Sequence, residues 1–209
     1  VSLIVNGLML MLTYQIPLIL SPDMDPIVAV LRNNFWLSTH VTVITISYAA
    51  FTLAMVFGNI LLIRAWFQKD LSNYVKEYSH YAYRMIQLGC FLLTVGIILG
   101  GIWADYSWGR FWGWDPKETW ALISIMIYAF VIHARLIPKM DNKWLFSVMS
   151  MFAFVSILFT YYGVNFHLVG LHSYASGEAK SLSWIWLTLG GISLIGLIAY
   201  PKYRKYYKR

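Results

Sequence analysis

Four tryptophans and two carboxylates fall within one short segment of the chain, Trp108-Gly-Arg-Phe-Trp112-Gly-Trp114-Asp115-Pro-Lys-Glu-Thr-Trp120. An interfacial aromatic belt in a membrane protein accounts for an occasional tryptophan, but not for this density. Clustered indole rings offer a flat and largely apolar surface to a planar hydrophobic ligand. Haem is such a ligand, and this segment is the candidate site.

Histidines elsewhere in the chain could supply the iron ligands of a haem. Two neutral imidazoles that approach from opposite sides can fill both axial positions of the iron, and His40 and His172 are the candidates for that pair. His167 precedes His172 by five residues and is an alternative that spacing does not exclude. His133, in the helix after the tryptophans, is either a ligand of a second site or a residue at the membrane edge.

The acidic part of the tryptophan segment is also a helix start. Asp115 fits the N-cap position, Pro116 the first helical position, and Glu118 the third, from which its carboxylate can reach back to the cap. Both carboxylates would lie at the positive end of the helix dipole. Asp115 is therefore predicted to act first as a cap that fixes the angle at which Trp112 and Trp114 are presented.

The composition requires that these residues be positioned by membrane helices. Hydrophobic residues make up 59% of the chain and charged residues only 12%, with a mean hydropathy of +0.61. We predict one all-α domain over 1–209, a polytopic integral membrane helix bundle. Apolar runs of spanning length predict about six helices, at 2–19, 41–65, 84–103, 119–137, 144–163 and 183–200. The first run has no initiator Met or basic flank and is interpreted as the start of a cut chain, not as a signal peptide.

The basic residues predict the orientation of this bundle. With the C-terminus in the cytoplasm, twelve Lys and Arg residues fall on the cytoplasmic side and four on the other side. The segments 20–40, 104–118 and 164–182 then face outward, and they carry His40, the tryptophan loop 104–118 and His172 to one face. We expect a site where these three segments converge.

The net charge of +7 is mainly a consequence of this topology. The basic cytoplasmic tail 201–209 is predicted to stop transfer and to bind anionic membrane lipids, and we expect no nucleic acid as a partner. Cys90 is the single cysteine, so the chain cannot form an internal disulfide or a Cys-x-x-Cys thiol pair, and we interpret Cys90 as a packing residue.

The tryptophan segment resembles the "WWD" signature of the haem-handling proteins of cytochrome c assembly. Its continuation Asp-Pro-Lys-Glu-Thr-Trp120 is most similar to the CcsA (ResC) family of the system II pathway. Trp36-Leu-Ser-Thr-His40-Val, His133 and Gly170-Leu-His172-Ser-Tyr174 match the same family, and the resemblance runs from about residue 30 to 200.

This resemblance implies a cytochrome c synthase of the haem lyase type. Haem b would be carried to the outer face and joined by thioether bonds to the Cys-x-x-Cys-His motif of an apocytochrome c. It implies that His40 and His172 ligate the iron of an outer haem and His133 that of an inner haem. The haem-binding surface would comprise Trp108, Trp112, Trp114, Asp115 and Trp120. No general base or nucleophile stands out in the chain, so catalysis would consist of positioning the haem.

The resemblance also implies partners and a location. They are a CcsB-like subunit or fused domain, which would hold the partner ligand of His133, the apocytochrome and a thiol-reducing protein. The membrane would be a bacterial inner membrane or a thylakoid. Two other functions fit the same residues. One is an electron-transfer subunit with bis-histidine haem, and the other is a haem exporter that performs no attachment.

Overall fold

The computed structural model describes residues 35–67, 72–172 and 183–207, and over these ranges the chain is helical with no strand. The predicted all-α class is therefore confirmed. The helices are α2 (Phe35–Phe67), α3 (Ser72–Trp108), α4 (Pro116–Ala134), α5 (Lys143–Leu158), the π-helix η2 (Phe159–Gly163), α6 (Val164–His167) and α7 (Ser183–Tyr207).

Four stretches are long and apolar enough to cross a membrane, namely Phe35–Arg64, Tyr74–Trp108, Pro116–Ala134 and Lys143–His167. They correspond to the second to fifth predicted helices. The apolar part of α7 is shorter, at Trp186–Pro201. The predicted helix 2–19 lies outside the described residues, so a total of six helices stays a prediction.

The loop that carries the tryptophans is shorter than the predicted 104–118. Helix α3 continues to Trp108, and Gly109 then turns the backbone into the left-handed region at φ 68°. Helix α4 already begins at Pro116, so the non-helical loop comprises residues 109–115. At the other end of the chain, α7 runs through Pro201 into the predicted basic tail, since membrane helices tolerate an interior proline.

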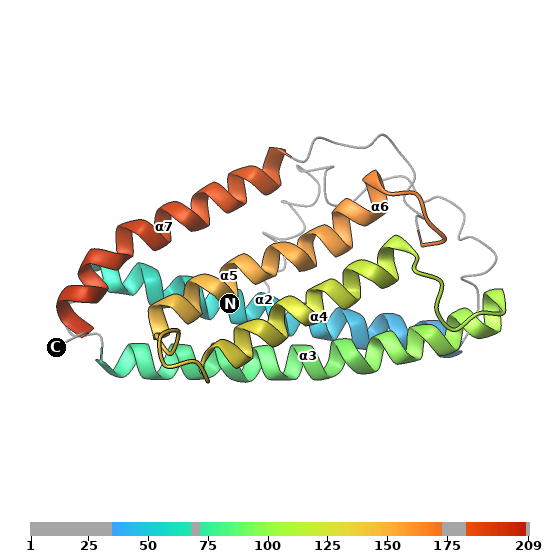
Figure 1. The fold of residues 1–209 in the computed structure, drawn as a ribbon, viewed down its shortest axis with the longest axis horizontal. Coiled ribbons are helices and arrows are strands. Elements are labelled where there is room, and N and C mark those ends of the chain that lie inside the picture. The colour runs from blue at the N-terminus through green and yellow to red at the C-terminus, as the bar shows by residue number, and fades with distance from the viewer. Residues whose placement is uncertain (1–34, 68–71, 173–182, 208–209) are drawn as a thin grey trace, which may run out of the picture.

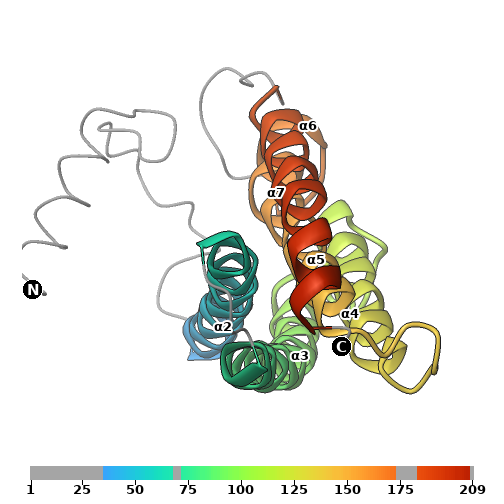
Figure 2. The same cartoon turned by 90° about the vertical axis from the view of Figure 1, so that its left-hand side faces the viewer.

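The helices form an elongated bundle in which α2 and α3 lie side by side (Figure 1). Helix α2 also contacts α5 and α7, and α4 packs on α3 and α5. The end-on view shows α4, α5 and α7 arranged beside the α2–α3 pair (Figure 2). Loop 109–115 lies at one end of the bundle, hereafter called the loop end.

Small residues on α3 allow α2 to approach closely. A Cβ added to Gly89 would lie 2.7 Å from the ring of Phe51, and one added to Gly96 would lie 2.5 Å from the side chain of Ile44. Phe51 in turn stacks on Tyr128 of α4 at a ring separation of 3.9 Å, inside the core shared by α2 to α5. The glycines of α3 thus fix the position of α2 relative to the site.

Replacing Gly89 by Val should destabilise the bundle, because the added atoms overlap Phe51 in a filled core. We expect a loss of about 1–3 kcal/mol, seen as a lower midpoint of thermal unfolding by circular dichroism in detergent. Gly190→Val in α7 is the matched control, since a Cβ there meets nothing within 4 Å. Equal shifts in the two variants would contradict close packing of α2 against Gly89.

Candidate functional site

The start of α4 is the rigid element of the loop end. Asp115 is the N-cap, and its Oδ2 accepts a hydrogen bond from the backbone N of Lys117 at 3.0 Å. Glu118 completes the capping box, since its Oε2 accepts from the backbone N of Asp115 at 3.1 Å. The predicted cap, with Pro116 at the first helical position, is therefore confirmed.

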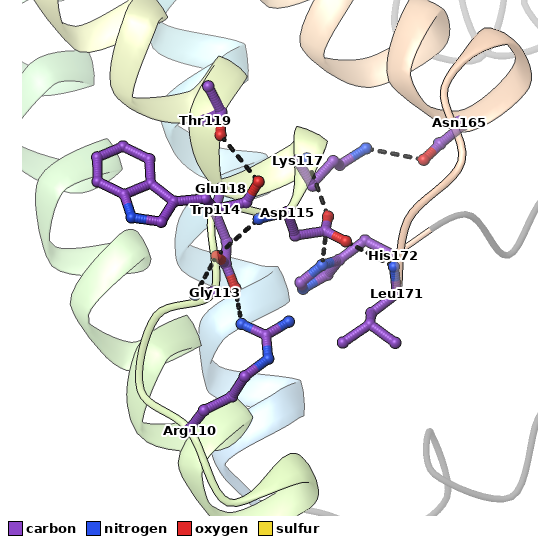
Figure 3. A network of polar contacts seen from close by, with 10 residues as sticks. All are labelled: Arg110, Gly113, Trp114, Asp115, Lys117, Glu118, Thr119, Asn165, Leu171 and His172. Atoms are coloured by element: carbon purple, nitrogen blue, oxygen red, sulfur yellow. Dashed lines mark hydrogen bonds and ion pairs between the residues drawn. The ribbon is translucent and has the colours of Figure 1, made fainter.

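Glu118 also folds the tryptophan loop onto α4 (Figure 3). Its Oε2 accepts from the backbone N of Gly113 at 2.8 Å, and its Oε1 lies 3.2 Å from the Arg110 guanidinium. The carboxylate thus collects donors from both halves of loop 109–115. Trp114, held between these contacts, adopts a left-handed conformation at φ 57°, which is costly for a residue with a Cβ.

Asp115 connects α4 to the segment that follows α6. Its Oδ1 accepts a hydrogen bond from the backbone N of Leu171, and its Oδ2 lies 3.0 Å from Nδ1 of His172 (Figure 3). Gly170 makes this approach possible, since a Cβ there would collide with the Asp115 carboxylate. The aspartate itself is buried, with 6% of its surface exposed. The Asp115 carboxylate thus holds the start of α4 and residues 171–172 together.

The contact with Asp115 also fixes the tautomer of His172. A carboxylate only accepts hydrogen bonds, so Nδ1 of His172 carries the proton and the lone pair lies on Nε2. Burial lowers the pKa of His172 below its usual value, although Asp115 acts in the opposite direction. The imidazole is therefore neutral near pH 7, as a metal ligand must be, and the carboxylate–histidine pair is typical of metal sites.

His40 reaches the loop end from α2 and has the same tautomer. Its Nδ1 lies 2.6 Å from the carbonyl oxygen of Gly96, which is an acceptor, so its lone pair is on Nε2. The ring lies against Gly100, where an added Cβ would come within 2.5 Å of the imidazole. The Gly96-x-x-x-Gly100 pair of α3 therefore forms the seat of this histidine.

A cavity of about 440 Å³ lies among α2, α3, α4 and the η2–α6 segment at the loop end. His40 and His172 both line it, as does Trp112 from the loop. Much of the remaining wall is apolar, and the volume is that of a small-molecule site. Its lining also includes Leu37, Val41, Ile44, Tyr48, Ile97, Trp103, Phe111, Lys117, Glu118, Ala121, Tyr161 and Asn165.

The other predicted tryptophans take different positions. Trp108 packs edge-on to His172 at 5.1 Å between ring centres and is not one of the residues that line the cavity. Trp114 is 69% exposed and makes an edge contact with Trp112 at 5.8 Å. Trp120 packs on Phe159 at 4.2 Å. Asp115, Trp108 and Trp114 thus contact residues of the cavity wall, whereas Trp112 itself lines the cavity.

His133 and His167 lie apart from this cavity. His133 is exposed near the end of α4 that is remote from the loop, with Nδ1 2.7 Å from the carbonyl oxygen of Ala129. His167 is exposed at the end of α6, and its ring lies 6.2 Å from that of Tyr162. Of the two histidines that spacing left open, His172 is the one that reaches the cavity within the described residues.

The sequence did not predict several of the residues that line the cavity. Trp103 is buried at 1% exposure and contacts both Trp108 and His172. In the sequence, it is one residue of an apolar helix with nothing to distinguish it. Tyr161 and Asn165 reach the cavity from a segment whose π-turn has no simple sequence signal. One signal was available in the sequence but was not used in the predictions above: the Gly96-x-x-x-Gly100 spacing is typical of close helix approach.

Comparison with known proteins places this chain among related sequences. Residues 1–172 match the family model described as Cytochrome C assembly protein. The chain is 44% identical over 163 residues to Protein NrfI of Wolinella succinogenes, covering 76% of this chain and 18% of that protein. It is 37% identical to cytochrome c biogenesis protein CcsA of Chlamydomonas reinhardtii (72% and 43% covered) and 32% identical to CcsA of Guillardia theta (83% and 66%). The chain thus spans less than two-thirds of the length of these relatives.

Replacing Glu118 by Gln should loosen loop 109–115, because the amide cannot replace the charged acceptor shared by Arg110, Gly113 and Asp115. Charge-assisted hydrogen bonds of this kind contribute about 1.5 kcal/mol or more, so trypsin should cleave after Arg110 about tenfold faster. Mass spectrometry of timed digests in detergent measures this rate. Glu77→Gln, at an exposed position of α3, is the matched control, and equal cleavage in both variants would contradict the role of Glu118.

Proposed function

The chain belongs to the cytochrome c assembly protein family, and from this premise we propose that it binds haem in the loop-end cavity and presents it for covalent attachment to an apocytochrome c. One observation carries the proposal. His40 and His172, from distant parts of the sequence, line the same cavity with their Nδ1 protons committed to acceptors. The lone pairs that could bind iron are then on Nε2 of both rings.

The cavity fits the chemistry of haem b as the substrate. Aliphatic side chains of α2 and the indole of Trp112 suit an apolar macrocycle, and two neutral imidazoles suit its iron. Asp115 orients His172 as a carboxylate beside a ligating histidine commonly does. Trp108, Trp114 and Trp120 then act by holding the loop and its neighbours around this ligand, with Trp114 as an exposed aromatic surface beside the site.

The attachment reaction requires orientation more than acid–base chemistry. A cysteine S–H of the apocytochrome adds across each haem vinyl group, so that a carbon–sulfur bond forms, the proton goes to the neighbouring carbon and no electron is consumed. The residues of this chain would hold the iron and the ring until both thiols are in place. The histidine of the Cys-x-x-Cys-His motif could then replace His40 or His172 as an iron ligand. A separate protein would keep the substrate thiols reduced.

We place the loop end outside the cytoplasm, in the periplasm or the thylakoid lumen. The cations Arg64, Lys76, Arg135, Lys139 and Lys143 lie toward the opposite end of the bundle, whereas Arg110 and Lys117 lie at the loop end. This is the bias expected of cytoplasmic segments. His133, near that end, would ligate a haem on its way outward together with a histidine of a CcsB-like subunit or fused domain. Because the relatives are longer than this chain, this partner is part of the proposal.

Histidine substitutions test the binding site. In the full-length protein purified in detergent, His40→Ala and His172→Ala should each abolish the bis-histidine absorption spectrum, and added imidazole should restore it by filling the empty position. His167→Ala is the matched control and should leave the spectrum unchanged, because His167 lies outside the cavity wall. Loss of the spectrum in His167→Ala but not in His172→Ala would overturn the ligand assignment.

Co-expression with an apocytochrome separates attachment from export and from electron transfer. We expect covalently bound haem on a reporter with Cys-x-x-Cys-His, measured by the peroxidase activity of denatured gels, and haem retained by this protein when both reporter cysteines are alanine. Free haem released outside in both cases would identify an exporter. Haem that stays bound and is reduced by quinol, with no attachment to either reporter, would identify an electron-transfer subunit.

A further inference from the structure

Lys117 brings a positive charge to the wall of the cavity. It stands in the first turn of α4, and its Nζ donates to Oδ1 of Asn165 at 2.9 Å and lies 5.8 Å from the centre of the Tyr161 ring (Figure 3 shows the contact with Asn165). An ammonium group has three donors, and the amide oxygen of Asn165 accepts one of them. Among the described residues, the contacts of this ammonium group in the mostly apolar cavity are thus with the neutral side chains of Asn165 and Tyr161.

The neighbouring carboxylates are committed to other partners. Glu118 pairs with Arg110, and Asp115 binds His172 and Leu171. Within the described residues, no carboxylate oxygen lies within 4.0 Å of Lys117 Nζ. Asp115 still attracts Lys117 from a longer distance. A charge withdrawn from water without a direct ion pair is costly, so an anion entering the cavity would be stabilised at this position.

The π-helix η2 positions Asn165 and Tyr161 beside the ammonium group of Lys117. The backbone N of Val164 donates to the carbonyl oxygen of Phe159, a bond that spans five residues instead of four. The extra residue shifts the face presented by the following turn by roughly 100°, the rotation of one residue. Thr160, 3.0 Å from Ser124 and 3.2 Å from the carbonyl oxygen of Trp120, fixes the widened turn on α4.

We propose that Lys117 and Asn165 form a binding site for a carboxylate of the ligand that enters the cavity. The ammonium supplies charge, and Nδ2 of Asn165 supplies further donors once its Oδ1 accepts from Lys117. This inference rests on the proposed function, in which the carboxylate is a haem propionate. Because the vinyl groups lie on the edge of the porphyrin away from the propionates, holding the carboxylate edge here leaves the vinyl edge for the incoming thiols.

The test compares haem with haem dimethyl ester, which lacks the carboxylate charges but keeps the iron and the ring. Dissociation constants are measured by absorption titration of the full-length protein in detergent. Wild type should bind haem about tenfold more tightly than the ester, the difference expected for one charged hydrogen bond. Lys117→Met should bind both ligands equally while keeping the bis-histidine spectrum, and Lys117→Arg should retain the preference.

The matched control is Lys139→Met, at an exposed position beyond α4, which should behave as wild type. A wild type that binds both ligands equally through its histidines would overturn this inference and leave the proposed function standing. A wild type that binds neither ligand would overturn both. If Lys117 instead bound a lipid phosphate, Lys117→Met would lose co-purified anionic lipid and its ratio of the two dissociation constants would equal that of wild type, which also overturns the inference.

Discussion

A carboxylate that is removed from water must find donors within the protein, and Asp115 finds them in three places. It caps α4 through Lys117, accepts from the backbone of Leu171 and holds the imidazole of His172. Since His172 lies on the cavity wall, the geometry of the site depends on this one group. An isosteric amide could preserve some of these contacts, but it would present a donor as well as an acceptor to a residue whose tautomer now depends on a pure acceptor.

The cavity wall formed by α2 and α3 depends on glycines of α3, which have no side chain. His40 can reach the carbonyl oxygen of Gly96 because Gly100 leaves room for its ring, which lies directly on the helix backbone, while Gly96 leaves room for Ile44. The same closeness continues at Gly89, where Phe51 enters the core. The cavity is thus bounded by a polar anchor on the α4 side and by a close helix contact on the α2–α3 side, and the tryptophan loop covers the space between them.

Local signals in the sequence were sufficient for much of this arrangement. The capping box of α4 was predictable because it depends on residues within four positions of one another. The class of membrane protein was predictable because it depends on composition. The predicted topology brought His40, His172 and Trp112 only to the same face, and in the structure all three line one cavity. Helix limits were less accurate, because α3 continues until Gly109 and α7 continues through Pro201. The contacts of Lys117 with Asn165 and of Trp103 with His172 depend on packing and on a π-turn, which no short pattern specifies.

The two histidines of the cavity are far apart in the chain, with α3, α4, α5, η2 and α6 between them. During synthesis His40 is therefore made long before His172. The contact between Asp115 and His172 can form only after α6 has been made. During most of synthesis the cavity consequently lacks one of its two imidazoles. The cavity wall is therefore complete only when the segment after α6, which carries His172, has been made.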